Sequence, residues 1–235
     1  MIDIHSHILP EIDDGPDSIN ESIEMCLMAL SDGIDTIVAT PHINPGLYNH
    51  SKKLIIEKIS ELKDRIGDKG LNLSILPGAD IRIDPGLLDD IRDTIFLTVN
   101  DNNRYIMIEL PFDIIPHGTD SILNSLFSRG IIPIISHPER NIQIQNDFSI
   151  LRSWKRRGIL FQVTAMSITG GFGIEVERCV KRWLKDDLID IIATDAHSTD
   201  KRPPILSHAL KIAGEIIGEE KAYQMVTTFP ESVTG

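Results

Sequence analysis

The chain has few cysteines and no long apolar run, and both absences narrow the class of protein. Only two cysteines occur among 235 residues, Cys26 and Cys179, so a disulfide framework of the secreted type is excluded. Each lies in amphipathic, helix-like sequence, where we expect a core thiol. The apolar runs, such as GIIPII, fall far short of the roughly 20 residues that cross a bilayer. The start of the chain lacks the basic region of a secretory signal. We therefore expect a cytoplasmic protein without direct membrane insertion.

Basic side chains are also scarce. The 23 lysines and arginines stand against 35 aspartates and glutamates, which gives a formal net charge of −12. This charge repels a nucleic-acid backbone, so no nucleic-acid partner is expected. Hydrophobic residues make up 41% and charged residues 25%, as in ordinary folded proteins. Because no linker or repeat divides the sequence, we expect one domain over residues 1–235.

Short β-branched runs alternate with longer helical patterns, which predicts βα units around a parallel sheet. The predicted strands cover residues 1–5, 35–39, 73–77, 105–109, 131–135, 159–163 and 190–194. The predicted helices lie near residues 18–32, 51–66, 117–129, 147–157, 173–187 and 204–217. Residues 78–104 break this rhythm and predict a hairpin or a short-helix excursion. Seven such strands form either a distorted barrel with one unit missing or an open doubly wound sheet.

Polar side chains follow all but one of these strands, in segments such as MIDIHSH, ISHPER and ATDAH. The carboxyl ends of parallel strands lie on one face of a sheet, so these side chains can converge. His5 and His7 are two residues apart in extended chain and point the same way. One histidine at a strand end is more often structural, but the coincidence of all of them favours a polynuclear metal site. The candidate ligands are His5, His7, His42, Asp80, Glu109, His137, Asp195 and His197.

Other polar features carry weaker signals. His50, His117 and His208 lie away from strand ends, and we assign them no role. Asp13 and Asp14 are predicted to form a turn before the first helix and at most to support the site. The segment ITGGFG at 168–173 could present backbone N–H groups to an anion, but a plain loop is the favoured interpretation.

The ligand set indicates the ion and the chemistry. Eight imidazole and carboxylate groups exceed the needs of one tetrahedral zinc and suit two or three ions of Mn, Fe or Zn. Such a cluster lowers the pKa of bound water from 15.7 to about 7. Arg140 and Arg202 lie just beyond ligand positions, and guanidinium groups bind phosphate oxygens in pairs, so a phosphate ester is the expected substrate. A cysteine-dependent phosphatase is excluded, because Asp32 and Lys185 stand six residues after the two cysteines, where that mechanism needs arginine.

These motifs carry a family resemblance. MIDIHSHILPEIDDGPDS, ATPH, LPGADIRI, IELPF, ISHPERN and ATDAHS resemble, in order and spacing, the motifs of the polymerase-and-histidinol-phosphatase (PHP) superfamily. The closer resemblance is to the bacterial manganese-dependent protein-tyrosine phosphatases of capsule and exopolysaccharide clusters. It covers nearly the whole chain. It implies a distorted (β/α)7 TIM-like barrel of the PHP type that holds Mn²⁺ ions. It also implies hydrolysis of phosphotyrosine on the C-terminal tail of a membrane-associated tyrosine autokinase.

The resemblance also implies roles for individual residues. The eight candidate ligands match the metal ligands of the family, and Arg140 and Arg202 match its phosphate-binding arginines. We expect His42 to serve in catalysis as well as in metal binding. The family usually has glutamate where this chain has Asp80, and the shorter side chain is expected to bridge two ions less well.

Two other functions stay open at this stage. The first is a small-molecule phosphomonoesterase, such as a histidinol-phosphate phosphatase, or a nuclease, against which the acidic charge argues. The second is a metal-stabilised scaffold without turnover. The sequence leaves the oligomeric state open.

Overall fold

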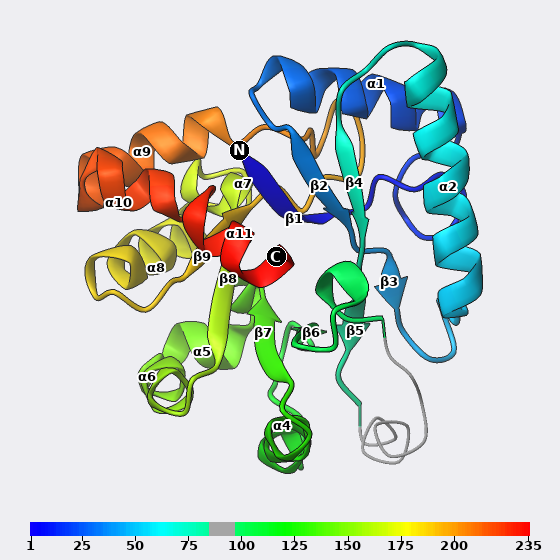
Figure 1. Cartoon of the computed structure of the whole chain (residues 1–235). Helices are drawn as coiled ribbons and strands as arrows, with labels where there is room; N and C mark the ends of the chain where they lie inside the picture. The colour runs from blue at the N-terminus through cyan, green and yellow to red at the C-terminus, as the bar shows by residue number, and fades with distance from the viewer. Residues whose placement is uncertain (85–96) are drawn as a thin grey trace.

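The computed structural model describes residues 1–84 and 97–235, and its strands form two parallel sheets (Figure 1). The three-stranded sheet has the order β1-β2-β4 and the six-stranded sheet has the order β3-β5-β6-β7-β8-β9. The first sheet comprises β1 (Ile2–Ser6), β2 (Thr36–Ala39) and β4 (Ser74–Pro77). The second comprises β3 (His42–Ile43), β5 (Asp80–Arg82), β6 (Tyr105–Glu109), β7 (Ile132–Ser136), β8 (Leu160–Thr164) and β9 (Ile191–Ala193). The predicted α/β class with parallel strands is therefore confirmed.

After two of the predicted strands the chain crosses into the other sheet, where it forms the short strands β3 and β5, which were not predicted. The chain passes from β2 into β3 across Thr40 and Pro41, and from β4 into β5 across Gly78 and Ala79. Proline has no backbone N–H to donate to a ladder, so it suits a strand break. A Cβ on Gly78 would lie 2.6 Å from Cγ1 of Val38, so only glycine permits this approach of β4 to β2.

Hydrogen bonds also join the two sheets between the end of β1 and the segment after β9. The backbone N–H of Asp195 donates to the carbonyl of His5 at 2.8 Å, and that of His7 donates to the carbonyl of Ala196 at 2.8 Å. The end of β1 thus lies beside the segment after β9. The strand pairing gives two sheets rather than one continuous ladder, so the predicted barrel is confirmed only as an arrangement of parallel strands and helices.

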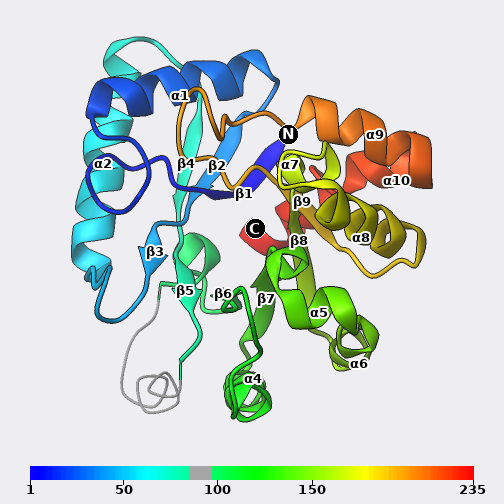
Figure 2. The same cartoon turned by 180° about the vertical axis from the view of Figure 1, so that it is seen from behind.

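Most helices lie around the outside of the strands, whereas α11 lies at their centre, as the two opposite views show (Figures 1 and 2). The longer helices are α1 (Ile19–Ser31), α2 (Lys52–Asp68), α4 (Thr119–Ser128), α8 (Ile174–Lys185) and α9 (Ser207–Ile217). The shorter ones are α5 (Ile142–Asn146), α6 (Ser149–Arg156), α7 (Ala165–Ile168), α10 (Glu219–Gln224) and α11 (Thr228–Thr234), with 3₁₀ turns η1 (Val99–Asp101) and η2 (Pro138–Arg140). No helix within the described ranges is long and apolar enough to cross a membrane.

The predicted elements correspond to these with a few differences. The helix expected near 147–157 is preceded by a separate short helix, α5, and the short helices α7, α10 and α11 were not predicted. Within the expected excursion at 78–104, β5 and η1 are present, and residues 85–96 lie outside the described part of the chain.

Apolar side chains form two cores. The larger core fills the space between strands and helices and includes Cys26, with the partly buried Cys179 packed against it. The smaller core draws on both sheets and is completed by α11. It consists of Ile4, Val38, Val99, Met107, Ile134, Ile191, Ala193 and Val233. Because this inner core fills the space between the strands, the polar strand ends gather on one side of it.

Candidate metal centre

Strand ends bring all eight predicted ligands into one cluster. Ile4 packs in the inner core while the adjacent His5 reaches the cluster. The register between β1 and β2 shifts between Asp3 and Ser6, and such an irregularity lets consecutive residues depart from strict alternation. The Nε2 atoms of His5 and His7 lie 3.2 Å apart, as expected for residues that share one site.

Asp195 is the carboxylate at one side of the cluster. Its Oδ1 lies 3.4 Å from Nε2 of His5, 3.4 Å from Nε2 of His7 and 3.7 Å from Nδ1 of His197. The side chain is 1% exposed, and Oδ1 has no hydrogen-bond partner in the described part of the chain. A buried carboxylate oxygen without a donor is costly, so this atom is placed as a ligand would be.

Asp80 occupies the other side of the cluster. Its Oδ2 lies 3.7 Å from Nε2 of His5, 3.6 Å from Nδ1 of His42 and 3.8 Å from Nε2 of His137. Within the described ranges Oδ2 also has no hydrogen-bond partner, whereas Oδ1 accepts a hydrogen bond from Ser136 at 2.8 Å. One oxygen of Asp80 is therefore held by the protein, and the other faces three imidazoles.

Four overlapping sets of side chains could each hold an ion. In each set the ligand atoms lie within 4.8 Å of one another. The sets are His7, Asp14, His42 and His197; His5, His7 and Asp80; His5, His137 and Asp195; and His42, Asp80 and Glu109. All eight predicted ligands belong to at least one set. His5, His7, His42 and Asp80 each belong to two, as expected where neighbouring ions share ligands.

Asp14 joins these residues, although the sequence indicated only a turn at this position. Its Oδ1 lies 3.5 Å from Nε2 of His42 and 3.5 Å from Nε2 of His197. The predicted turn brings the backbone of Gly15 close to that of His7, since a Cβ on Gly15 would lie 2.4 Å from the carbonyl oxygen of His7. The close approach that Gly15 permits carries Asp14 to the cluster. Two adjacent aspartates after an HSH motif are the signal that could have marked Asp14 as a ligand.

Further polar residues orient the imidazoles from outside. Asp13 Oδ2 lies 2.7 Å from Nδ1 of His7 and accepts from the backbone N–H of His42 at 2.9 Å. Gln162 Oε1, on the one strand without a predicted ligand, lies 2.9 Å from Nδ1 of His5. A partner on one ring nitrogen fixes the tautomer that leaves the other nitrogen free to bind a cation. Sequence reasoning gave Asp13 at most a supporting role and missed Gln162.

Two ligand positions have unusual backbone. The φ angle is 31° at His137 and 53° at Asp195, in the left-handed region that few residues other than glycine adopt. Conformations of this kind cost about 1–3 kcal/mol and persist at functional sites. His137 directly follows β7 and Asp195 lies two residues after β9, where this turn redirects the chain toward the cluster.

Both predicted arginines lie beside the cluster. Arg140 Nη1 lies 3.3 Å from Oδ2 of Asp195, and Arg202 donates to the same oxygen. A third arginine, Arg82, was missed and lies 3.0 Å from Oε1 of Glu109. Asp80 and Arg82 are two residues apart on β5, so strand alternation could have identified Arg82.

Burial and neighbouring charges shift the pKa values of the carboxylates in different directions. Burial raises the pKa of Glu109 to about 7, and the charge of Asp80 adds to the increase. Burial also acts to raise the pKa of Asp80, but the nearby histidines outweigh it and hold the pKa below its usual range. The same balance, with Arg202 included, holds the pKa of Asp195 well below its usual range.

The histidines differ in a similar way. Burial lowers the pKa of His42 to about 3, aided by His7, and burial also lowers the pKa of His137 and of His197. Burial acts to lower the pKa of His7, but Asp13 outweighs it and raises this pKa to about 10. Metals bind neutral imidazole and ionised carboxylate, so most of the cluster is in the form that binds a cation. His7 must first lose a proton.

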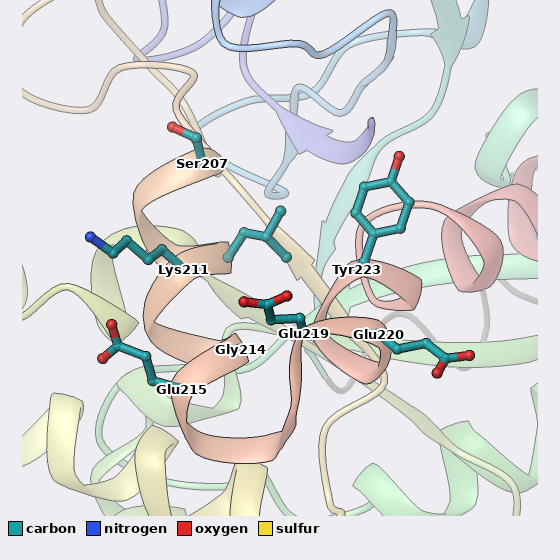
Figure 3. A pocket seen from close by; sticks show the side chains of 8 residues that line it. Ser207, Lys211, Gly214, Glu215, Glu219, Glu220 and Tyr223 are labelled. Atoms are coloured by element: carbon teal, nitrogen blue, oxygen red, sulfur yellow. The ribbon is translucent and has the colours of Figure 1, made fainter.

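Other polar features lie outside these sets. His50, His117 and His208 belong to none of the candidate metal sets found in the described ranges. A hollow of about 610 Å³ lies between α9 and α10, lined by residues such as Leu210, Lys211 and Tyr223 (Figure 3). It contains no predicted ligand.

Parallel strands, a buried cluster of imidazoles and carboxylates, and adjacent arginines together define a candidate metal-dependent hydrolase of phosphate esters. The model of the CpsB/CapC family, described as capsular polysaccharide synthesis proteins, matches residues 1–234, and the chain belongs to this family. This confirms the family indicated by the motifs.

Relatives named as tyrosine-protein phosphatases are similar to this chain over most of their length. The chain is 37% identical to tyrosine-protein phosphatase YwqE of Bacillus subtilis (strain 168), covering 96% of this chain and 88% of the relative. It is 38% identical to the putative tyrosine-protein phosphatase CapC of Staphylococcus aureus, covering 88% and 80%. A solved structure from work on YwqE and on CpsB of Streptococcus pneumoniae, described as unique metal-dependent tyrosine phosphatases, superposes with a TM-score of 0.94. That structure is 36% identical, with 100% of this chain and 94% of the other covered.

Proposed function

We propose that this chain is a metal-dependent protein-tyrosine phosphatase. The observation that carries the proposal is the pair of buried carboxylate oxygens, Asp80 Oδ2 and Asp195 Oδ1, which face imidazoles and have no hydrogen-bond partner in the described part of the chain. Two arginines, Arg140 and Arg202, pair with Asp195 at the edge of this cluster. The named activity of the relatives supports the same conclusion.

The donor set fits two or three ions, and Mn²⁺ is the proposed metal. Imidazole and carboxylate without thiolate suit Mn, with Fe and Zn as alternatives. The residues that would hold the ions are His5, His7, His42, Asp80, Glu109, His137, Asp195 and His197, with Asp14 as a ninth. When bound, such ions polarise the phosphoryl group and lower the pKa of water.

The side chains of the protein bind and orient the substrate. Arg140 and Arg202 are each about 20% exposed, so their remaining N–H groups can donate to phosphoryl oxygens. Asp195 holds both guanidinium groups in position. The departing phenolate of tyrosine has an ordinary pKa near 10 and needs little help from an acid. We propose that His42 serves in catalysis as a neutral imidazole that binds a cation, since burial lowers its pKa to about 3.

The wider assignment follows from the family. We propose that the substrate is phosphotyrosine on the tail of a membrane-associated bacterial tyrosine kinase, whose dephosphorylation regulates capsular or exopolysaccharide synthesis. We also propose that residues 1–235 act as one domain, and that the two sheets are arcs of a distorted (β/α)7 barrel of the PHP type. The passage of β2 into β3 and of β4 into β5 supports the barrel. The expected cytoplasmic location stays a prediction.

The test compares substrates with and without metal. The purified protein with Mn²⁺ is expected to hydrolyse a phosphotyrosine peptide faster than histidinol phosphate, and to lose activity on chelation and regain it with added Mn²⁺. Full activity after chelation contradicts metal dependence. A preference for histidinol phosphate favours the small-molecule alternative, and bound metal without turnover favours the scaffold.

A further inference from the structure

Arginines and phenylalanine rings alternate along the edge of the candidate metal centre. The guanidinium carbon of Arg140 lies 4.5 Å from the ring centroid of Phe112 and 4.8 Å from that of Phe172. Arg82 lies 5.6 Å from the ring of Phe112, and Arg202 lies 5.7 Å from the ring of Phe172. We call these five residues the aryl ladder. All four distances fall within the range of cation–π attraction.

The arginines of the aryl ladder are tied to the cluster by carboxylates. Arg140 and Arg202 both reach Asp195, and Arg82 reaches Glu109. A phosphoryl group bound to Arg140 therefore lies next to the two rings that flank this arginine.

The loops that carry the two rings are built to present them. Phe112 follows β6 by three residues and is 41% exposed, a large apolar surface to leave in water. Phe172 lies among Gly170, Gly171 and Gly173. The φ angles of Gly170 and Gly173 are 85° and 97°, and a Cβ on Gly171 would lie 2.6 Å from Cε of Met166. The glycines thus leave Phe172 as the one large side chain of this loop, so the segment 168–173 presents a ring.

A similar stack of a phenylalanine on two arginines lies elsewhere in the molecule, away from the candidate metal centre. Phe148 lies 4.9 Å from the guanidinium carbon of Arg152 and 4.2 Å from that of Arg182. Those two arginines pair with Asp186, which belongs to none of the candidate metal sets. The stack at Phe148 joins outer helices, whereas the aryl ladder joins rings to arginines of the proposed phosphate site. Phe148 therefore provides a matched control.

We propose that Phe112 and Phe172 make this site selective for aryl phosphates over alkyl phosphates. This proposal rests on the proposed phosphatase function and names the residues that set its preference for an aromatic substrate. The ring of phosphotyrosine can pack against the exposed ring of Phe112, whereas phosphoserine and phosphothreonine have no ring to place there. An aromatic pair strengthens binding by about two- to tenfold beyond the buried area. We expect each ring to contribute a preference of this size.

The test uses two phosphonates that the enzyme cannot hydrolyse. Phenylphosphonate and methylphosphonate present the same anion with and without a ring, and calorimetry on the Mn²⁺-loaded protein measures the Kd of each. The wild-type protein is expected to bind phenylphosphonate about threefold or more tightly than methylphosphonate. Phe112→Leu and Phe172→Leu keep apolar volume but lack the ring, so each should reduce this ratio. Phe112→Tyr should retain it, and Phe148→Leu should leave it unchanged.

The outcomes separate the two proposals. If the wild-type protein binds neither phosphonate, the phosphate site itself is wrong, and the selectivity falls with it. If it binds both equally, the phosphate site stands and the aryl selectivity is wrong. A preference that survives in Phe112→Leu, Phe172→Leu and the double variant, or that Phe148→Leu also removes, overturns the role of the aryl ladder.

Discussion

An aspartate lies near each end of β9, and the two differ in whether their oxygens have hydrogen-bond donors. Asp190 directly precedes the strand, and both of its oxygens have donors: Lys155 Nζ lies 2.8 Å from Oδ1, and the backbone N–H of Phe161 lies 2.9 Å from Oδ2. Asp195 follows the strand, and its Oδ1 faces three imidazoles without a hydrogen-bond partner in the described ranges. Satisfied oxygens are typical of a structural carboxylate. An unsatisfied oxygen among imidazoles is typical of a ligand.

The pKa values of Asp190 and Asp195 also shift in opposite directions. Burial raises the pKa of Asp190, and the charge of Lys155 offsets this only in part. Burial also acts to raise the pKa of Asp195, but the histidines and Arg202 reverse the direction. The φ angle of 53° at Asp195 adds backbone strain that a structural role does not require. The neighbours of a buried carboxylate, rather than its burial, therefore identify the functional one.

The largest expected effect comes from replacing the carboxylate of Asp195, which we propose as a metal ligand, with an amide. Asp195→Asn is expected to reduce bound metal and to lower kcat/KM by more than about 100-fold, because loss of even an outer partner of a ligand costs 10–100-fold. Asp190→Asn should retain both metal and activity. Elemental analysis and hydrolysis of p-nitrophenyl phosphate measure the two effects. Equal metal content in the two variants would show that the hydrogen-bond partners of Asp190 and Asp195 do not distinguish a metal ligand from a structural residue.

Arg140 gives the next largest effect. Arg140→Ala is expected to lower kcat/KM for a phosphotyrosine peptide by about 10- to 100-fold, the size of a lost charged hydrogen bond, without loss of metal. Arg152→Ala is the control, since Arg152 also stacks on a phenylalanine and pairs with an aspartate, but lies away from the cluster. A similar loss in both variants would contradict the phosphate-binding role of Arg140.

Asp14 is expected to matter less, because its side chain is 51% exposed and joins only one of the ligand sets. Asp14→Ala should lower the affinity for one ion by about tenfold, as outer partners of ligands do, and leave the other ions in place. Metal titration followed by elemental analysis measures this. The exposed Asp17 is the matched control. Unchanged affinity in Asp14→Ala would remove Asp14 from the ligand set.

Much of the fold follows from the sequence because parallel strands are apolar and short. All seven predicted strands are present with nearly the predicted bounds. Periodicity does not reveal that the chain continues from two of them into the short strands β3 and β5 of the other sheet, since the breaks at Pro41 and Gly78 depend on what the neighbouring strands contact. The short helices α7, α10 and α11 are too brief to show a helical period.

The candidate ligands follow from the sequence for a related reason. Polar residues at strand ends are few, and topology brings them together whatever the intervening loops do. Asp14, Phe112 and Phe172 could not be assigned so easily. Their contacts come from turns and loops whose path depends on close backbone approaches, such as that at Gly15.

The smallest effect concerns Asp190 and the dependence of stability on pH. Its folded pKa lies above the ordinary value of 3.8, so the folded state binds more protons than the unfolded state as the pH rises above 3.8. Stability from this group is therefore fully present at low pH and is lost as the pH rises through the folded pKa. Asp190→Asn cannot ionise, so its free energy of unfolding relative to the wild type should increase between pH 3 and pH 7. Urea unfolding of the metal-free proteins at several pH values measures this, and a relative decrease would show that Lys155 stabilises the ionised form and that Asp190 resembles Asp195 after all.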